Sequence, residues 1–134
     1  MVNFARMIKP DILQLSTNGN FYAHFFQQNS QPMWVFDIFT LGFLEVNNAA
    51  VKAYGYTRAE FLNMSIKDIR PYDEIEKLEL YIPTLPGQNG SNKQWLHIKK
   101  DGTVISVNIS SIAVLYNGVF ARLVTVYEVT GSVE

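Results

Sequence analysis

Two glycine turn signals in the last third of the chain constrain its fold more than any other feature. Asp101-Gly102 and Asn117-Gly118 are typical of tight β-hairpins, because glycine adopts the positive φ that such turns require. Each turn lies between runs in which apolar and polar residues alternate, which is the period of a half-buried strand. The sequence therefore predicts an antiparallel meander with strands at 94–100, 103–116 and 119–129.

The faces of these strands follow from the same alternation. At 94–100, Leu96 and Ile98 alternate with Trp95 and His97, and we expect the first pair to face the core. The second pair is then expected on the outer face, at an interface or an edge. In the next strand the alternation slips at Ser110-Ser111, which predicts a bulge or a bend there.

A separate hairpin is predicted near the start of the chain. Residues 33–38 and 43–46 have strand composition, and Trp34, Phe36 and Ile38 would share one face. The meander strands are apolar on both faces, so the outer face needs a cover from the N-terminal region or from another molecule.

Short helices are predicted between the two groups of strands. Asn47 or Asn48 can cap a first helix, which Gly55 ends. Thr57 and Glu60 have the spacing of a capping box for a second helix.

Two further helical segments follow. Ser65 can cap a single turn, in which Asp68 lies near the helix start. A longer helix is expected after Pro71, with Ile75, Leu78 and Ile82 on its buried side, and 83–93 has the composition of a loop.

The N-terminal region is expected to be partly helical. Apolar residues at helical spacing run through Phe4, Met7, Ile8, Ile12 and Leu15, although Pro10 must interrupt them. A short helix is predicted over 21–28. Its aromatic residues are candidates for a dimer interface: Phe21, Tyr22, Phe25 and Phe26.

Composition argues against several classes of function. The 134 residues suffice for one domain with its own core. With 11 basic and 12 acidic residues, the net charge is −1, so we expect neither nucleic acid nor a membrane surface as a partner. No apolar run approaches the ~20 residues that span a bilayer. The N-terminus also lacks the order of a signal peptide, since Pro10 and Asp11 interrupt it, so we expect a cytoplasmic protein. His24 and His97 have no neighbouring cluster of ligands, so we expect no metal site.

Three segments together resemble the PAS sensor family. PMWVFD at 32–37 is similar to the family's first strand. VNNAAVKAYGYTRAEF at 46–61 looks like its Asn-started helix and Gly-Tyr turn, and WLHIKKDGT at 95–103 looks like its central hairpin. The resemblance implies an α+β fold of the PAS-like (profilin-like) type: a five-stranded antiparallel sheet with short helices on one face and an N-terminal helix.

The resemblance also implies a domain organisation. A PAS domain would occupy 21–130, after an N-terminal extension at 1–20, and 131–134 would begin an output linker. In the family, a segment similar to Glu128-Val129-Thr130 joins the last strand to an output helix. Because the chain stops at Glu134, we expect a sensor domain cut from a larger signalling protein, such as a histidine kinase or a cyclic-dinucleotide enzyme. A free-standing domain would have a similar sequence.

By the same resemblance, a small molecule could bind between the sheet and the helices. The candidate wall residues, each of which could equally just fill the core, are Phe36, Ile38, Val46, Ala50, Tyr54, Leu62, Ile66, Leu78, Ile82, Ile98, Ile109 and Val124. Tyr54 stands apart because a buried phenol needs a hydrogen-bond partner, which a ligand could supply.

The cofactor types of the family can be tested against the sequence. The chain has no cysteine, which excludes the covalent flavin adduct and the cysteine-linked chromophore. Residues 72–82 contain no histidine, so we expect no haem. Non-covalent flavin stays open, and the ligand is unknown.

Two alternatives to a ligand sensor remain open. The first is a homodimerisation module with a filled core that relays a neighbour's signal, and cavity volume separates it from a sensor. The second is a small isomerase-like enzyme, for which Asp37 is the best acid-base candidate. Asp68 and Lys99 could pair across the pocket rim, as charged pairs in the family do, although the sequence does not assign the partner.

Overall fold

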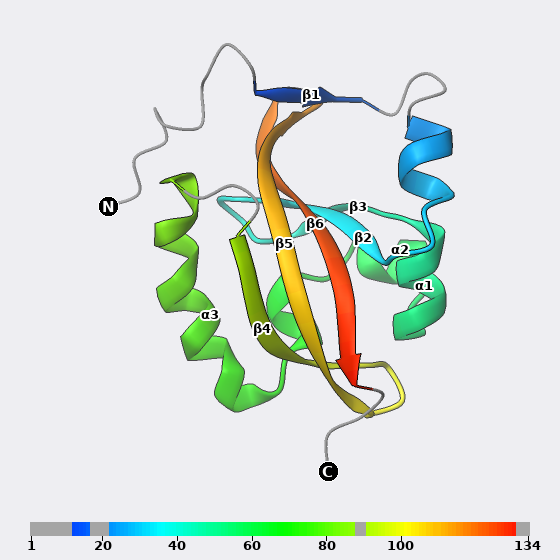
Figure 1. Cartoon of the computed structure of the whole chain (residues 1–134), viewed down its shortest axis with the longest axis vertical. Helices are drawn as coiled ribbons and strands as arrows, with labels where there is room; N and C mark the ends of the chain where they lie inside the picture. Colours follow the sequence, from blue (N-terminus) through cyan, green and yellow to red (C-terminus); the bar gives the residue numbers. More distant parts are fainter. Residues whose placement is uncertain (1–11, 17–21, 88–90, 131–134) are drawn as a thin grey trace.

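Six strands form one curled sheet within the residues that the structure, a computed structural model, describes: 12–16, 22–87 and 91–130 (Figure 1). The strands are β1 (Leu13–Leu15), β2 (Met33–Asp37), β3 (Phe43–Val46), β4 (Ser91–Ile98), β5 (Val104–Tyr116) and β6 (Val119–Thr130). The α-helices are α1 (Asn48–Tyr54), α2 (Arg58–Phe61) and α3 (Ile75–Tyr81). The π-helix η2 (Tyr22–Gln27) and three 3₁₀ segments complete the fold: η3 (Ile66–Ile69), η4 (Tyr72–Glu74) and η5 (Ile82–Gly87).

The sheet confirms the predicted α+β architecture. Neighbouring strands follow the order β1-β5-β6-β2-β3, and β4 pairs with β5 beside β1. The two predicted glycine turns connect β4 to β5 and β5 to β6, with φ of 93° at Gly102 and 82° at Gly118. The first hairpin joins β2 to β3, and β2 pairs with β6 at the centre of the sheet.

The N-terminal region departs from the expected helix. Leu13–Leu15 run parallel to β5, with Leu15 opposite Tyr116, and the backbone N–H of Asn117 donates to the carbonyl of Leu15. The free edge of β5 offers this segment backbone partners, which outweighs its helical spacing. The predicted helical role of Ile12 and Leu15 is therefore wrong, whereas Phe4, Met7 and Ile8 lie outside the described residues.

The irregularity in β5 also lies elsewhere than predicted. Ser110 and Ser111 pair regularly with Thr125 and Val124, and the register shifts between Ser106 and Val107 instead. Ser111 faces the helices because its hydroxyl accepts from a buried arginine, so a polar residue at an inward position does not mark a bulge here.

The capping signals are confirmed residue by residue. Asn47 is the N-cap of α1, and Gly55 ends that helix with φ of 87°. Thr57 and Glu60 form the capping box of α2, and Ser65 and Asp68 form one at η3. These short helices, each seven residues or fewer, therefore begin and end where their sequences specify.

The segment after α3 is more ordered than its loop-like composition predicts. Leu78 is buried on α3, and the 3₁₀ segment η5 continues from Ile82 to Gly87. Leu85 anchors η5 because its side chain is only 3% exposed. The next strand, β4, begins at Ser91, within the expected loop.

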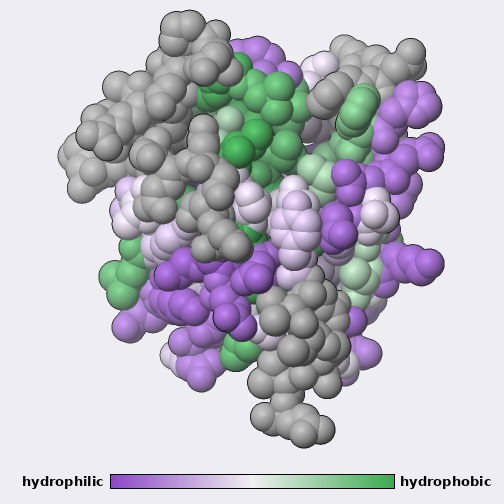
Figure 2. Space-filling model, in the orientation of Figure 1, coloured by the Kyte–Doolittle hydropathy of each residue, from purple (hydrophilic) through white to green (hydrophobic). Residues whose placement is uncertain are grey.

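Apolar residues form a separate core on each face of the sheet. On the inner face, α1, α2, η3, α3 and η5 pack against β2, β4, β5 and β6 around Trp34 and Phe61. On the outer face, Phe26 of η2 and Leu15 of β1 cover Val35, Val114 and Ala121. Figure 2 shows apolar side chains at the surface near the end of the molecule where β1 lies. The apolar outer face that the sequence predicts is thus partly covered by the chain itself.

Candidate functional site

A small cavity lies in the inner core, between η3, α3 and η5 and the sheet. Its volume is about 30 Å³, whereas pockets for drug-sized ligands measure roughly 300–1,000 Å³. Rings fill the space nearby, since Trp34 lies 5.5 Å from Phe43 and 5.5 Å from Tyr54 between ring centroids. The cavity is lined by Trp34, Phe36, Ile66, Arg70, Leu78, Tyr81, Ile82, Leu85, Trp95, Ile109, Ser111 and Val124.

A buried hydrogen bond between Tyr54 and His97 joins α1 to β4. The Tyr54 hydroxyl oxygen lies 2.5 Å from Nδ1 of His97, and the two residues are 1% and 0% exposed. Burial, with a smaller contribution from the charge of Arg70, holds the pKa of His97 well below its ordinary value, so the ring is neutral. With the phenol as donor, the ring proton lies on Nε2, which is buried and has no hydrogen-bond partner.

Arg70 brings a positive charge to the same interior. Its Nη1 donates to the carbonyl of Ile66 at 2.6 Å, and its guanidinium carbon lies 5.0 Å from the centroid of the Trp95 ring. Its Nε–H is buried without an acceptor. Burial lowers the pKa of Arg70 to about 10, against the effects of Tyr54 and Glu74, so the side chain stays charged at neutral pH. No carboxylate among the described residues forms an ion pair with it.

Arg122 places a second positive charge behind the cavity. This β6 residue is 0% exposed, and its Nη2 donates to the hydroxyl of Ser111 at 2.9 Å and to its carbonyl at 3.2 Å. Nη1 donates to the carbonyl of Leu85 at 3.2 Å, so the arginine ties η5 to the sheet. Burial lowers the pKa of Arg122 to about 10.

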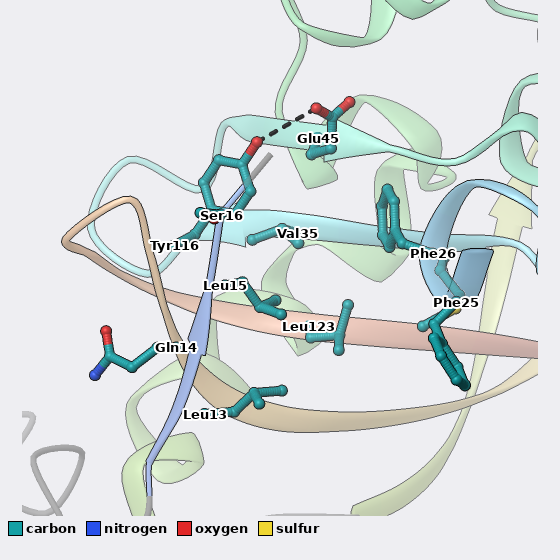
Figure 3. Close-up of a pocket in the computed structure, with 11 residues that line it drawn as sticks. Leu13, Gln14, Leu15, Ser16, Phe25, Phe26, Val35, Glu45, Tyr116 and Leu123 are labelled. Atoms are coloured by element: carbon teal, nitrogen blue, oxygen red, sulfur yellow. Dashed lines mark hydrogen bonds between the residues drawn. The ribbon is translucent and has the colours of Figure 1, made fainter. Parts of the chain in front are cut away.

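A larger cavity, of about 290 Å³, lies on the outer face. Figure 3 shows leucines of β1 on one side, the aromatic rings of η2 on the other, and Leu123 between them. At one end Glu45 is buried, where it accepts from Tyr116 Oη at 3.3 Å and from Arg58 Nε at 2.8 Å. The lining residues are Leu13, Gln14, Leu15, Ser16, Phe25, Phe26, Met33, Val35, Glu45, Tyr116 and Leu123.

A third hollow, of about 450 Å³, is a groove between α1 and the strands β5 and β6. Its walls include Tyr54 and Val126, and the exposed residues Ser30 and Lys52 border it. The groove thus brings α1 next to the part of β6 that precedes residues 128–130. The full lining is Ser30, Gln31, Pro32, Ala49, Lys52, Ala53, Tyr54, Lys99, Ile105, Val107 and Val126.

The predicted wall residues divide into three groups. Those that line the inner cavity are Phe36, Ile66, Leu78, Ile82, Ile109 and Val124. Those buried in the same core without lining that cavity are Ile38, Val46, Ala50 and Tyr54. The last group, Leu62 and Ile98, lies outside this core. Both residues are half-buried, Leu62 at the end of α2 and Ile98 in β4.

The faces predicted for β4 are reversed in the structure. Trp95 and His97 are 2% and 0% exposed in the inner core. Strand alternation turns the half-buried Ile98 to the opposite face, so it is not a wall residue. Both alternating sets of positions in β4 carry apolar side chains, so alternation alone does not select the inner face. The hydrogen bond of His97 to Tyr54 holds Trp95 and His97 on that face.

Sequence reasoning missed the two buried arginines. Arg122 could have been found, because it alternates in phase with Val124 and Val126 on the inner face of β6. Arg70 follows a single 3₁₀ turn and precedes Pro71, so no period indicates its direction.

Two charged residues singled out in the sequence have local structural roles. Asp37 Oδ1 accepts from the backbone N–H groups of Phe39 at 2.7 Å and Thr40 at 3.1 Å, so the candidate acid closes the β2–β3 turn. Asp68 Oδ2 accepts from Ser65 N at 2.8 Å. The expected pair of Asp68 with Lys99 is absent from the described residues because Asp68 faces its own helix start.

The predicted aromatic helix and output segment are described only in part. Phe21 lies outside the described residues, and Tyr22 is described by its backbone alone. Phe26 is 7% exposed in the outer core, whereas Phe25 is 63% exposed. The backbone of Glu128, Val129 and Thr130 belongs to β6, whose last residue pairs with Ser106.

The described residues contain no helix long and apolar enough to cross a membrane. Within the same ranges, no three side chains of the His, Cys, Asp or Glu type gather as metal ligands would.

A family model described as PAS domain matches residues 30–130, and the chain therefore belongs to the PAS domain family. No curated protein sequence matches the chain.

Solved structures with the same fold come from several signalling proteins. The PAS domain of an HTR-like protein from Haloarcula marismortui is 18% identical, with a TM-score of 0.67 over 79% of this chain and 87% of that one. A domain of a sensory box sensor histidine kinase/response regulator from Geobacter sulfurreducens is 20% identical, with a TM-score of 0.62 over 78% and 89%.

A third similar structure contains a small molecule. It is the PAS domain, in complex with ethanol, of a LuxR-family transcriptional regulator from Burkholderia thailandensis. That domain is 15% identical, with a TM-score of 0.67 over 81% of this chain and 96% of its own.

Proposed function

We propose that this PAS domain works as a homodimeric relay module in a larger signal-transduction protein of the histidine kinase or cyclic-dinucleotide enzyme type. The observation that carries the proposal is the cavity between η3, α3, η5 and the sheet, whose volume of about 30 Å³ leaves no room for a flavin or a haem. The histidine kinase among the similar structures supports the class of parent protein.

The relay would run from the helices to the end of β6. Tyr54 ties α1 to β4, Arg122 ties η5 to β5 and β6, and β6 ends at the predicted output segment 128–130. A change in the position of α1 or η5 would therefore alter the position of β6 through these contacts. A signal from a neighbouring domain or a ligand shifts the equilibrium between two conformations of the domain only by its difference in affinity for those conformations.

The proposal is tested by native mass spectrometry and an absorption spectrum of the purified protein. A dimer without added mass and without visible absorption would support the relay. A cofactor-sized mass that disappears on denaturation would overturn it, and so would a monomer at every concentration tested.

A second candidate function, sensing of a very small molecule, is favoured by the unpaired Nε of Arg70 at the inner cavity. The ethanol complex of the Burkholderia thailandensis domain supports the idea that a PAS fold accepts a ligand of this size. No enzymatic reaction is proposed, since Asp37 is used in a turn.

A further inference from the structure

Within the described part of the chain, the inner cavity combines apolar walls with a buried positive charge that forms no ion pair. Arg70, which lines it, is 8% exposed and has a buried Nε–H without an acceptor. A buried cation normally has an anionic partner, because the loss of its hydration is otherwise not offset. Among the described residues, Arg70 has a backbone carbonyl and an aromatic face as direct partners and also feels the charge of Glu74, but it forms no ion pair.

The surroundings of the cavity add to this positive field. Arg122 lies directly behind two lining residues, Ser111 and Leu85, and its hydrogen bonds to them go to neutral oxygens. The imidazole of His97 lies beside Trp34 without lining the cavity; it is neutral, and its single N–H, at the buried Nε2, also lacks a partner in the ranges that the structure describes. The interior therefore offers donors and positive charge, and an anion complements both.

The size and shape of the cavity restrict the anion. A volume of about 30 Å³ exceeds what one water molecule needs and suits an ion of a few heavy atoms. The planar guanidinium matches a carboxylate better than a spherical ion. Phe36, Leu78 and Val124 form apolar walls that suit a short aliphatic tail.

We propose that the inner cavity binds a short-chain carboxylate such as formate or acetate, with the carboxylate against Arg70 and the aliphatic end against Phe36, Leu78 and Val124. The inference deepens the second candidate function, sensing of a very small molecule, and rests on it. Bound there, the carboxylate would neutralise Arg70 and strengthen the contact between η3, α3 and the sheet.

The test uses the intrinsic fluorescence of the protein, because both tryptophans of the chain, Trp34 and Trp95, line the cavity. The purified protein is titrated with sodium acetate at constant ionic strength, and with sodium chloride and acetamide as controls. Acetamide has the shape of acetate without its charge. We expect a saturable change with acetate alone. No response, or the same response to all three solutes, would overturn the proposal.

Arg70→Met removes the charge and keeps much of the volume, and it should weaken acetate binding by at least about tenfold, the equivalent of one lost charged hydrogen bond. Lys67→Met is the matched control, since it removes one exposed positive charge of the surface pair with Glu79 and should leave the titration unchanged. Equal titrations for the two variants would contradict the assignment to Arg70.

A second measurement keeps the test valid if Arg70→Met fails to fold. In the wild type, the ¹H–¹⁵N signal of Arg70 Nε, assigned with Arg70→Lys, should shift as acetate is added. An unchanged signal at saturating acetate overturns the carboxylate site. Dimer mass, measured in the same samples, reports separately on the relay, so the site can fail while the relay stands.

Discussion

Tyr54 and His97 are 43 positions apart in sequence and share a buried hydrogen bond of 2.5 Å between the phenol oxygen and Nδ1. The bond connects the capped helix α1 to the central hairpin, and both residues are almost fully buried. It pairs the phenol of Tyr54 with Nδ1 of His97, two polar groups that would otherwise be costly to place in an apolar interior, whereas Nε2 of His97 stays without a partner among the described residues.

Tyr54→Phe should therefore destabilise the domain. The variant keeps the ring and its packing on Trp34 but leaves Nδ1 of His97 without a partner, which we expect to lower the free energy of unfolding by about 1–3 kcal/mol. Urea denaturation followed by circular dichroism measures this. Tyr56→Phe removes the same atom from a half-buried ring nearby and should change stability much less. Equal losses in the two variants would contradict the role of the bond.

Stability should fall as the pH falls below the ordinary pKa of histidine. Burial holds the pKa of His97 well below 6.5 in the folded state, whereas the unfolded chain titrates near that value. The unfolded state therefore binds more protons in this window, and acid favours it by up to about 1.4 kcal/mol per pH unit. At neutral pH and above, this contribution to stability is fully present.

Thermal melts between pH 7.5 and 5 would measure this slope. His97→Gln should flatten it, because the titrating group is gone. His24→Gln, which removes the other histidine at an exposed position, should leave the slope as in the wild type. If His97→Gln kept the full slope, the assignment of the slope to His97 would be wrong.

Asn47→Ala should be among the most destabilising single substitutions outside the apolar core. The Asn47 side chain accepts from the N–H of Ala50 and Met33 and donates to the carbonyls of Phe26 and Gln31. Loss of the cap and of these buried partners should together cost roughly 3 kcal/mol. Asn48→Ala, one position along on an exposed site, is the control and should cost well under half as much in the same denaturation experiment.

The proposed homodimer makes the exposed Phe25 a test position. Phe25→Asp should raise the dimer dissociation constant by at least about tenfold, since it places a charge in an apolar contact. Analytical ultracentrifugation of both species measures it. Phe39→Asp is the control, because Phe39 is 57% exposed in the β2–β3 turn, away from η2. A dimer that tolerates Phe25→Asp and loses stability with Phe39→Asp would move the interface to the other end of the sheet.

Local signals in the sequence predict most of the fold. The two Gly turns, the Asn47 cap and the Thr57–Glu60 capping box each depend on contacts between near neighbours, and each lies where predicted. The faces of β4 could not be derived in this way. Trp95 and Ile98 lie on opposite faces of β4. Which face turns to the inner core depends on the hydrogen bond of His97 to Tyr54, a partner far away in sequence.

The candidate site was less predictable for the same reason. Apolar wall residues such as Phe36 and Val124 follow from strand alternation, and they do line the cavity. The direction of Arg70 depends on the packing of its guanidinium on Trp95, which no local pattern encodes. β1 is a further example, because its three residues become a strand only where the edge of β5 is available.

That edge has a practical consequence for any shortened version of the protein. β4 covers one side of β5 up to Ser111, and β1 continues the cover along the same side at Val114–Tyr116. A fragment that began at residue 21, or at residue 30 where the family match starts, would lack β1 and leave this backbone stretch open beside an apolar surface. Exposed strand edges recruit other strands, so such a fragment should aggregate more readily than the chain that includes residues 12–16.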